Sequence, residues 1–133
     1  MASDRTIAVA ERHDVEGFGN WNVKNGMNHV EPPEVLLQGM LTLRLHLDDT
    51  GADNGALDIV PGSHKLGRVP ANKVLGFARA VEAICCEAVA GEILAMRLTT
   101  IHKSERSANP TRRRVLHADY SGDKLPPPLT WLL

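Results

Sequence analysis

Glycine and proline interrupt this chain too often for long, continuous helices. The 133 residues include 11 glycines and 8 prolines, spread over the whole sequence. Glycine readily adopts positive φ, and proline cannot donate a backbone hydrogen bond, so both residues mark turns. The pattern favours many short strands joined by turns over a helix bundle. The length supports a single domain covering residues 1–133.

The clearest strand signal lies between residues 41 and 47. Leucines alternate with polar residues there: Leu41, Leu43, Leu45 and Leu47 on one face, and Thr42, Arg44 and His46 on the other. A period of two predicts a strand with its leucine face in the core. Asn54-Gly55 suits a tight turn with positive φ. Because an apolar segment returns at 56–60, we expect residues 41–60 to form a hairpin.

Further short apolar segments complete the predicted architecture. Strands are expected at residues 6–10, 84–89, 92–100 and 113–120, and the spacing of apolar residues predicts one helix over 70–83, capped by Asn72. Residues 11–34 have no sustained period and are expected to form a long loop. Parallel βαβ units would need alternating helices, so we expect a mainly β fold, an antiparallel sandwich or barrel such as a jelly roll.

Composition narrows the possible partners and the compartment. Fifteen basic and sixteen acidic residues give a formal net charge of −1, which offers no general attraction to nucleic acid or to an anionic membrane. No apolar stretch is long enough to span a membrane, and the N-terminus has no signal-peptide core. The only cysteines, Cys85 and Cys86, are adjacent, so a disulfide framework is excluded and a reducing, cytoplasmic setting is expected.

A few polar residues could carry chemistry. His102 ends an apolar strand, where it could be a half-buried packing residue or a metal ligand at a barrel mouth. Asp4 could lie at the surface or face the same mouth. The run 112–114 is either a solvated basic corner or contains an arginine turned inward to hold a carboxylate. Nucleic-acid binding through this run ranks well below both, because six basic residues over 97–114 in a neutral chain are weak evidence for it. The histidines show no zinc-binding spacing.

Two ordered stretches resemble the phytanoyl-CoA dioxygenase-like family of iron(II)/2-oxoglutarate oxygenases. The first comprises Leu47-Asp48-Asp49-Thr50, Asp53-Asn54-Gly55-Ala56-Leu57 and Val60-Pro61-Gly62-Ser63-His64-Lys65 with Gly67. The second comprises Gly91-Glu92-Ile93-Leu94, Ile101-His102-Lys103-Ser104 and Arg113-Arg114-Val115-Leu116-His117. The resemblance extends over nearly the whole chain, from Asp4 to Trp131.

This resemblance implies a double-stranded β-helix that holds iron(II) with two histidines and one carboxylate. Asp4 and His102 would be metal ligands, and no catalytic residues are expected beyond the metal ligands. Arg113 would pair with the distal carboxylate of the cosubstrate 2-oxoglutarate, with Ser104 as a hydroxyl partner. Family members consume 2-oxoglutarate and O₂, release succinate and CO₂, and hydroxylate a substrate, here an unidentified small molecule.

The metal motif departs from the family pattern at one position. The first metal histidine should stand two residues before Asp4, where this chain has Ala2. The chain therefore resembles an N-terminally truncated member with an incomplete domain, and His13, His29 or His46 could substitute for the absent ligand.

Two functional hypotheses follow. The chain is an iron(II)/2-oxoglutarate-dependent hydroxylase, or it is a catalytically impaired β-barrel remnant that binds a ligand or a protein. An incomplete barrel would expose an edge or an apolar face, and a homodimer would cover it.

Overall fold

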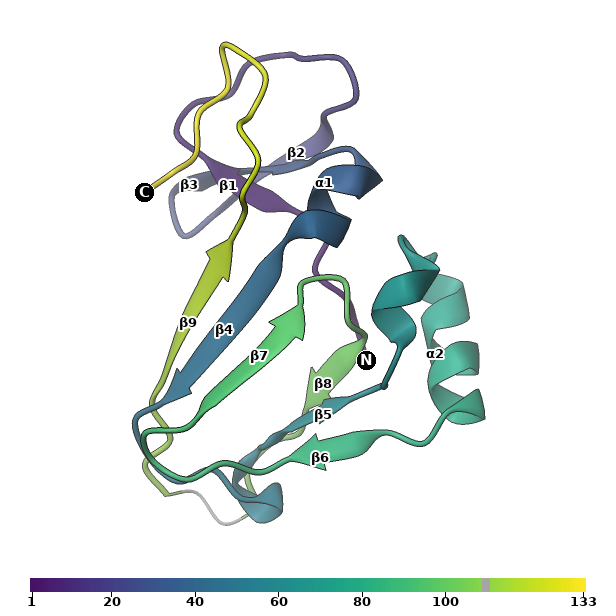
Figure 1. Cartoon of the computed structure of the whole chain (residues 1–133), viewed down its shortest axis with the longest axis vertical. Helices are drawn as coiled ribbons and strands as arrows, with labels where there is room; N and C mark the ends of the chain where they lie inside the picture. The colour runs from purple at the N-terminus through teal and green to yellow at the C-terminus, as the bar shows by residue number, and fades with distance from the viewer. Residues whose placement is uncertain (109–110) are drawn as a thin grey trace.

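The computed structural model describes residues 1–108 and 111–133, and the backbone of Ala71 without its side chain. The described part is mainly β, with nine strands and two α-helices (Figure 1). The strands are β1 (Ile7–Val9), β2 (Gly19–Lys24), β3 (Met27–Glu31), β4 (Leu41–His46), β5 (Leu57–Ile59), β6 (Ile84–Cys86), β7 (Ile93–Arg97), β8 (His102–Ser104) and β9 (Val115–Tyr120). The helices are α1 (Glu34–Gly39) and α2 (Ala71–Ala80).

Two antiparallel three-stranded sheets build the barrel-like part of the molecule. One has the strand order β7-β4-β9, and the other has the order β6-β5-β8. The chain passes from one sheet to the other after β4, β6, β7 and β8, as the colours in Figure 1 show. This alternation is the winding of a double-stranded β-helix, so the predicted mainly β fold is confirmed.

A third small sheet, with the order β1-β3-β2, lies at the end of the molecule that holds α1 and the C-terminus (Figure 1). The tail returns to this sheet, where Val9 and Trp131 form an isolated bridge. The larger hydrophobic core lies in this region and comprises Ile7, Val9, Val30, Leu36, Leu37, Met40, Leu98, Leu125 and Leu129. A smaller core lies beneath α2, and Val60, Val74 and Ile101 form its centre.

The expected orientation of the strand at 41–47 is wrong. Thr42 and His46 are 0% and 2% exposed, whereas Leu47 is 47% exposed. The polar face of β4 therefore points into the molecule. Its leucine face points outward, and the buried inner face combines polar Thr42 and His46 with apolar Met96 opposite Thr42 on β7.

The outward side of the β7-β4-β9 sheet forms an apolar surface that we call the outer face. Leu45 lies directly opposite Ile93 on β7 and Leu116 on β9, and directly opposed residues share a face. Ile93 and Leu116 are 58% and 60% exposed. Within the described part of the chain, no segment packs over these two side chains closely enough to bury them.

The expected hairpin at 41–60 is also wrong. β4 and β5 belong to different sheets, so the connection between them crosses the barrel instead of reversing within one sheet. Thr50 in this connection pairs with Ala88, and residues 52–54 form a short 3-10 helix. The positive φ expected at the Asn54-Gly55 turn is present, since Gly55 has φ of 73°.

The other local expectations have mixed outcomes. The segments at 6–10, 84–89, 92–100 and 113–120 contain β1, β6, β7 and β9, and the helix at 70–83 contains α2. That helix begins after Pro70, and its N-cap has no side-chain hydrogen bond, so the Asn72 cap is wrong. The expected loop at 11–34 contains β2 and β3. None of the helices in the described part is long and apolar enough to cross a membrane.

Candidate functional site

The candidate site begins at the free edge of β8. The strand pairs with β5 on one side, and on the other side Ala2 forms an isolated antiparallel bridge with His102. Each residue donates its backbone N–H to the carbonyl oxygen of the other, both at 2.9 Å. Residues opposed in this way point their side chains to the same face. Position 2 therefore lies on the His102 face of the sheet.

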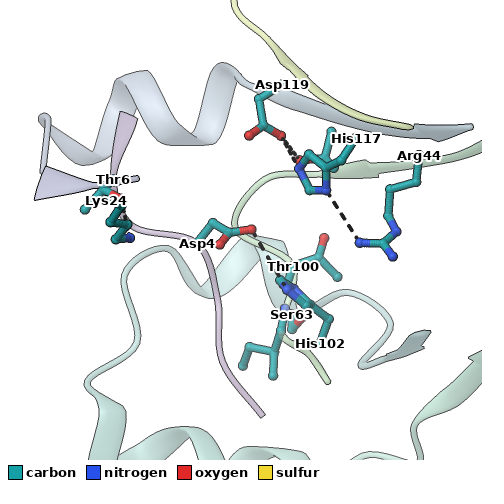
Figure 2. Close-up of polar contacts among 11 residues, drawn as sticks. Asp4, Thr6, Lys24, Arg44, Ser63, Thr100, His102, His117 and Asp119 are labelled. Carbon is teal, nitrogen blue, oxygen red and sulfur yellow. Dashed lines mark hydrogen bonds and ion pairs between the residues drawn. The ribbon is translucent and has the colours of Figure 1, made fainter. Parts of the chain in front are cut away.

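Asp4 and His102 come together at this edge. The Asp4 Oδ2 atom lies 3.9 Å from His102 Nε2 (Figure 2). The other ring nitrogen, Nδ1, lies 2.8 Å from the carbonyl oxygen of Thr100. A carbonyl oxygen only accepts hydrogen bonds, so Nδ1 carries the hydrogen, and in the neutral ring the lone pair is on Nε2. The pair thus offers one nitrogen and one carboxylate for a metal ion.

Arg113 lies beside the other end of β8. Its Nη1 atom donates to Ser104 Oγ at 3.2 Å and to the carbonyl oxygen of Gly55. Ser104 Oγ also donates to the Gly55 carbonyl at 2.8 Å. Gly55 allows this approach, because a Cβ atom at its position would clash with Nη1. Arg113 and Ser104 are therefore neighbours, which is the arrangement needed for a guanidinium and a hydroxyl to share one carboxylate.

The polar face of β4 and the neighbouring face of β9 form a wall that we call the inner wall. Asp119 Oδ1 accepts a hydrogen bond from Thr42 Oγ1 at 2.6 Å and lies 3.1 Å from His117 Nε2. His117 Nδ1 in turn lies 3.5 Å from Arg44 Nη1, and Figure 2 shows the three residues Arg44, His117 and Asp119 in a row. This wall was not predicted, although the alternation at 41–47 was its signal, because the polar face was assigned to solvent.

Two side chains of the inner wall have shifted ionisation. Burial lowers the pKa of Arg44, and so does the nearby positive charge of Arg113, while Asp4 acts in the opposite direction. Burial and the positive charge of Arg44 also lower the pKa of His46, against the effect of Glu92. His46 Nδ1 contacts Thr50 Oγ1 at 3.1 Å, and its buried Nε2 has no hydrogen-bond partner in the described structure.

An open cavity of about 450 Å³ connects the two groups of residues. It is lined by Met1, Ala2, Arg44, Leu57, His102, Lys103 and Ser104. Arg113 does not line it directly but contacts Ser104, which does. The cavity therefore brings the imidazole of His102, the hydroxyl of Ser104 and the guanidinium of Arg44 to one space, large enough for a small organic acid.

The described residues do not fit a complete three-ligand iron site. Over residues 1–108 and 111–133, no group of three or more His, Cys, Asp or Glu side chains could hold a metal ion. Asp4 and His102 offer two ligand atoms close together, and Ala2 stands where a histidine would face the same side.

The three histidines considered as substitutes do not complete the set. His13 lies beside Glu11, and His29 contacts Thr6. His46 is buried against Thr50.

Comparisons with known proteins agree with this fold. A family model described as phytanoyl-CoA dioxygenase (PhyH) matches residues 14–115, a range that includes His102, Ser104 and Arg113 but not Asp4. AviO1 from Streptomyces viridochromogenes Tue57 is 23% identical with a TM-score of 0.58, over 95% of this chain and 48% of that chain. EvdMO1 is 20% identical with a TM-score of 0.58, over 86% and 23% respectively. The chain thus spans about half the length of the first structure and less of the second, and no curated protein matches it.

Proposed function

The chain belongs to the phytanoyl-CoA dioxygenase family, and on that premise we propose that it is an iron(II)/2-oxoglutarate-dependent dioxygenase-like protein that acts on a small molecule. The observation that carries this proposal is the position of Asp4 and His102, 3.9 Å apart, beside the cavity that Ser104 also lines. The substrate is not identified by these residues. The size of the cavity supports a small molecule rather than a macromolecule.

We assign 2-oxoglutarate binding to Arg113 and Ser104. A guanidinium presents two parallel N–H donors that match the two oxygens of a carboxylate. The Ser104 hydroxyl would donate as well if its hydrogen turned from the Gly55 carbonyl to the carboxylate. The contact of Arg113 with Ser104 supports this role, because it places the guanidinium and the hydroxyl side by side. The sequence match of the family model over this segment supports it independently.

We assign iron(II) to Asp4 and His102 as an incomplete site. Non-haem iron oxygenases bind their metal through two histidines and one carboxylate, and the described residues offer one of each. We therefore propose that hydroxylation requires a third metal ligand in addition to Asp4 and His102. For the chain with Ala2, we expect binding of 2-oxoglutarate and weak binding of iron.

The alternative function is a catalytically impaired β-barrel that binds a ligand or a protein. The absence of a three-ligand group within the described residues favours it over a fully active hydroxylase. The two functions share the fold and the cavity. They differ in whether bound 2-oxoglutarate is converted.

One experiment separates these functions. The chain is titrated with 2-oxoglutarate by calorimetry, with and without iron(II) under anaerobic conditions, and succinate release is then measured in air. Binding that is lost in Arg113→Gln, together with succinate formation, supports the oxygenase. Binding without succinate supports the impaired module. If 2-oxoglutarate does not bind at all, both the cosubstrate assignment and the oxygenase are wrong.

Binding to nucleic acid, membranes or a second copy of the chain, and the cellular location, are separate predictions. Nucleic-acid binding through residues 112–114 is not expected, because Arg114 is paired with Asp48 and Arg113 contacts Gly55 and Ser104. Membrane association is not expected from a chain of net charge −1. A homodimer remains a prediction, supported by the apolar outer face, and a cytoplasmic location remains a prediction from the cysteine pattern.

A further inference from the structure

Arg44 carries a partly buried positive charge on the inner wall. Its Nε atom is buried and has no hydrogen-bond partner, and its one side-chain contact in the described structure is the 3.5 Å approach of Nη1 to His117. In the described residues, no carboxylate lies within ion-pair distance of its guanidinium. A charge removed from water without a partner costs free energy, and a bound anion would lower that cost.

The inner wall holds this guanidinium in a defined direction. Asp119 accepts hydrogen bonds, so His117 Nε2, 3.1 Å away, is the nitrogen that carries the hydrogen in the neutral ring. The lone pair then lies on Nδ1, which can accept from Arg44 Nη1. Thr42 fixes Asp119 from the other side at 2.6 Å. Since Nη1 is engaged by His117, the other nitrogen, Nη2, remains for a ligand.

The charges around Arg44 favour an anion in the cavity. Arg113 is close enough to act on Arg44 as a like charge, and Asp4 is the one carboxylate that acts on it in the opposite sense. Asp4 lies beside His102, and Asp119 is engaged by His117 and Thr42. Arg44 thus lines the cavity with the second guanidinium of Arg113 nearby, and an anion bound there would offset this positive charge.

We propose that Arg44 is a second anion-binding residue of the cavity and holds a carboxylate group of a bound small molecule. The geometry supports this role because Arg44 lines the same cavity as His102 and Ser104. Two sources supply this chemistry, namely 2-oxoglutarate itself or an acidic substrate bound next to it. This role depends on the proposed function in one respect, namely that this cavity is the binding site.

The test compares three arginine substitutions of equal charge change. Arg44→Gln removes the proposed contact, Arg113→Gln removes the contact proposed for 2-oxoglutarate, and Arg97→Gln is the matched control. Arg97 lies on β7 opposite Leu41, on the outward side of the same sheet, and is exposed. Calorimetry measures the affinity of each variant for 2-oxoglutarate. It then measures the affinities for hexanoate and for its neutral analogue hexanamide, once without 2-oxoglutarate and once with saturating 2-oxoglutarate.

If Arg44 holds the cosubstrate, Arg44→Gln lowers the affinity for 2-oxoglutarate about tenfold or more, while Arg97→Gln changes this affinity less than about twofold. If Arg44 holds an acidic substrate, 2-oxoglutarate affinity is unchanged, and hexanoate binds in preference to hexanamide only when Arg44 is present. Arg44→Lys keeps the charge and loses the planar fork, so it retains part of the affinity in either case.

The inference is wrong if Arg44→Gln, folded as judged by circular dichroism, binds 2-oxoglutarate and hexanoate as the Arg97→Gln control does. Failure of the proposed function has a different signature. In that case 2-oxoglutarate binding is absent or insensitive to Arg113→Gln, whereas hexanoate binding still depends on Arg44.

Discussion

Ala2 and His102 exchange two backbone hydrogen bonds of 2.9 Å, which makes the first residues of the chain a strand-like extension of the β6-β5-β8 sheet. The side chain at position 2 consequently shares a face with His102, and Asp4 lies on the same side. Position 2 therefore lies beside the two residues proposed to bind iron, and the effect of its side chain on metal binding is testable in a direct way.

Replacing Ala2 by histidine is expected to raise the affinity for iron(II) by at least about tenfold, because a third ligand is added at a site whose other two ligands are already close. Calorimetry under anaerobic conditions measures the change. Ala90→His, on an exposed turn, is the control for a histidine added elsewhere. Equal iron affinity in Ala2→His and the control would show that position 2 does not face the metal.

Replacing Gly55 by alanine is expected to displace Arg113, because the new Cβ would overlap the guanidinium. Alanine at a positive φ also costs about 1–2 kcal/mol in stability. Gly26→Ala separates the two effects, since Gly26 has φ of 76° and no other group lies within 4 Å of the position that its Cβ would occupy. Both substitutions should lower the melting temperature, but only Gly55→Ala should lower the affinity for 2-oxoglutarate, by about tenfold. Equal affinity in the two variants would contradict the placement of Arg113.

The pair between Asp48 and Arg114 should contribute a pH-dependent part of the stability. Arg114 donates to Asp48 from its backbone and from Nε at 2.8 and 2.9 Å, which lowers the pKa of the carboxyl to about 2 from 3.8. Since the pKa is lower in the folded chain, the stabilisation is complete above pH 4 and is lost as the pH falls toward 2.

Denaturant unfolding of Asp48→Asn at several pH values tests this pair. The difference in unfolding free energy between this variant and the native chain should be largest near pH 7, shrink below pH 4 and decrease with added salt. Asp14→Asn is the control, because Asp14 is 88% exposed and lies 3.7 Å from Arg12. A loss of stability that stays constant down to pH 2 would contradict the role of the ionised carboxylate.

Replacing Leu116 by lysine tests the predicted homodimer. Leu116 is 60% exposed on the outer face, so the substitution should leave the fold intact and reduce self-association. Val23→Lys, 67% exposed on β2, is the control for a lysine placed away from that face. Sedimentation velocity over a range of concentrations provides the measurement. A native chain that sediments as a monomer throughout would show that the homodimer prediction is wrong.

Shortening Leu37 to alanine should show that α1 anchors the larger core. Leu37 is 1% exposed, and the loss of its buried side chain should cost about 2–5 kcal/mol of unfolding free energy. Val35 on the same helix is 75% exposed, so Val35→Ala should change stability by less than about 0.5 kcal/mol. Similar costs for the two variants in denaturant unfolding would contradict the burial of Leu37.

Most of the fold class and many of the strands could be predicted from the sequence. Turn residues and short apolar segments indicated an antiparallel β fold, and β1, β6, β7, β9 and α2 lie where strands and a helix were expected. β2 and β3 were not predicted, because their sequences are rich in asparagine and glycine and their pairing is stabilised by neighbouring strands rather than by local preference.

The wrong orientation of β4 and the wrong hairpin at 41–60 have one cause, which is that a local sequence pattern does not report where a strand lies in the fold. Alternation shows that a strand has two unlike faces, but it does not show which face is enclosed, and here the enclosed face carries Thr42, Arg44 and His46. A turn signal such as Asn54-Gly55 likewise reports a local reversal of the backbone. It does not report whether the next strand joins the same sheet or the opposite one, as β5 does.

The winding of the chain between the two sheets also determines when the inner wall can form. Thr42 on β4 and Asp119 on β9, which are hydrogen-bonded in the folded protein, are separated by 77 positions in sequence. On the ribosome, β4 emerges long before its second neighbour is synthesised, and it cannot complete its pairing until β9 follows. Until then the edge of β4 that pairs with β9 lacks its partner, and the nascent chain is most vulnerable to aggregation in that interval. The residues that orient Arg44 are therefore among the last to be assembled.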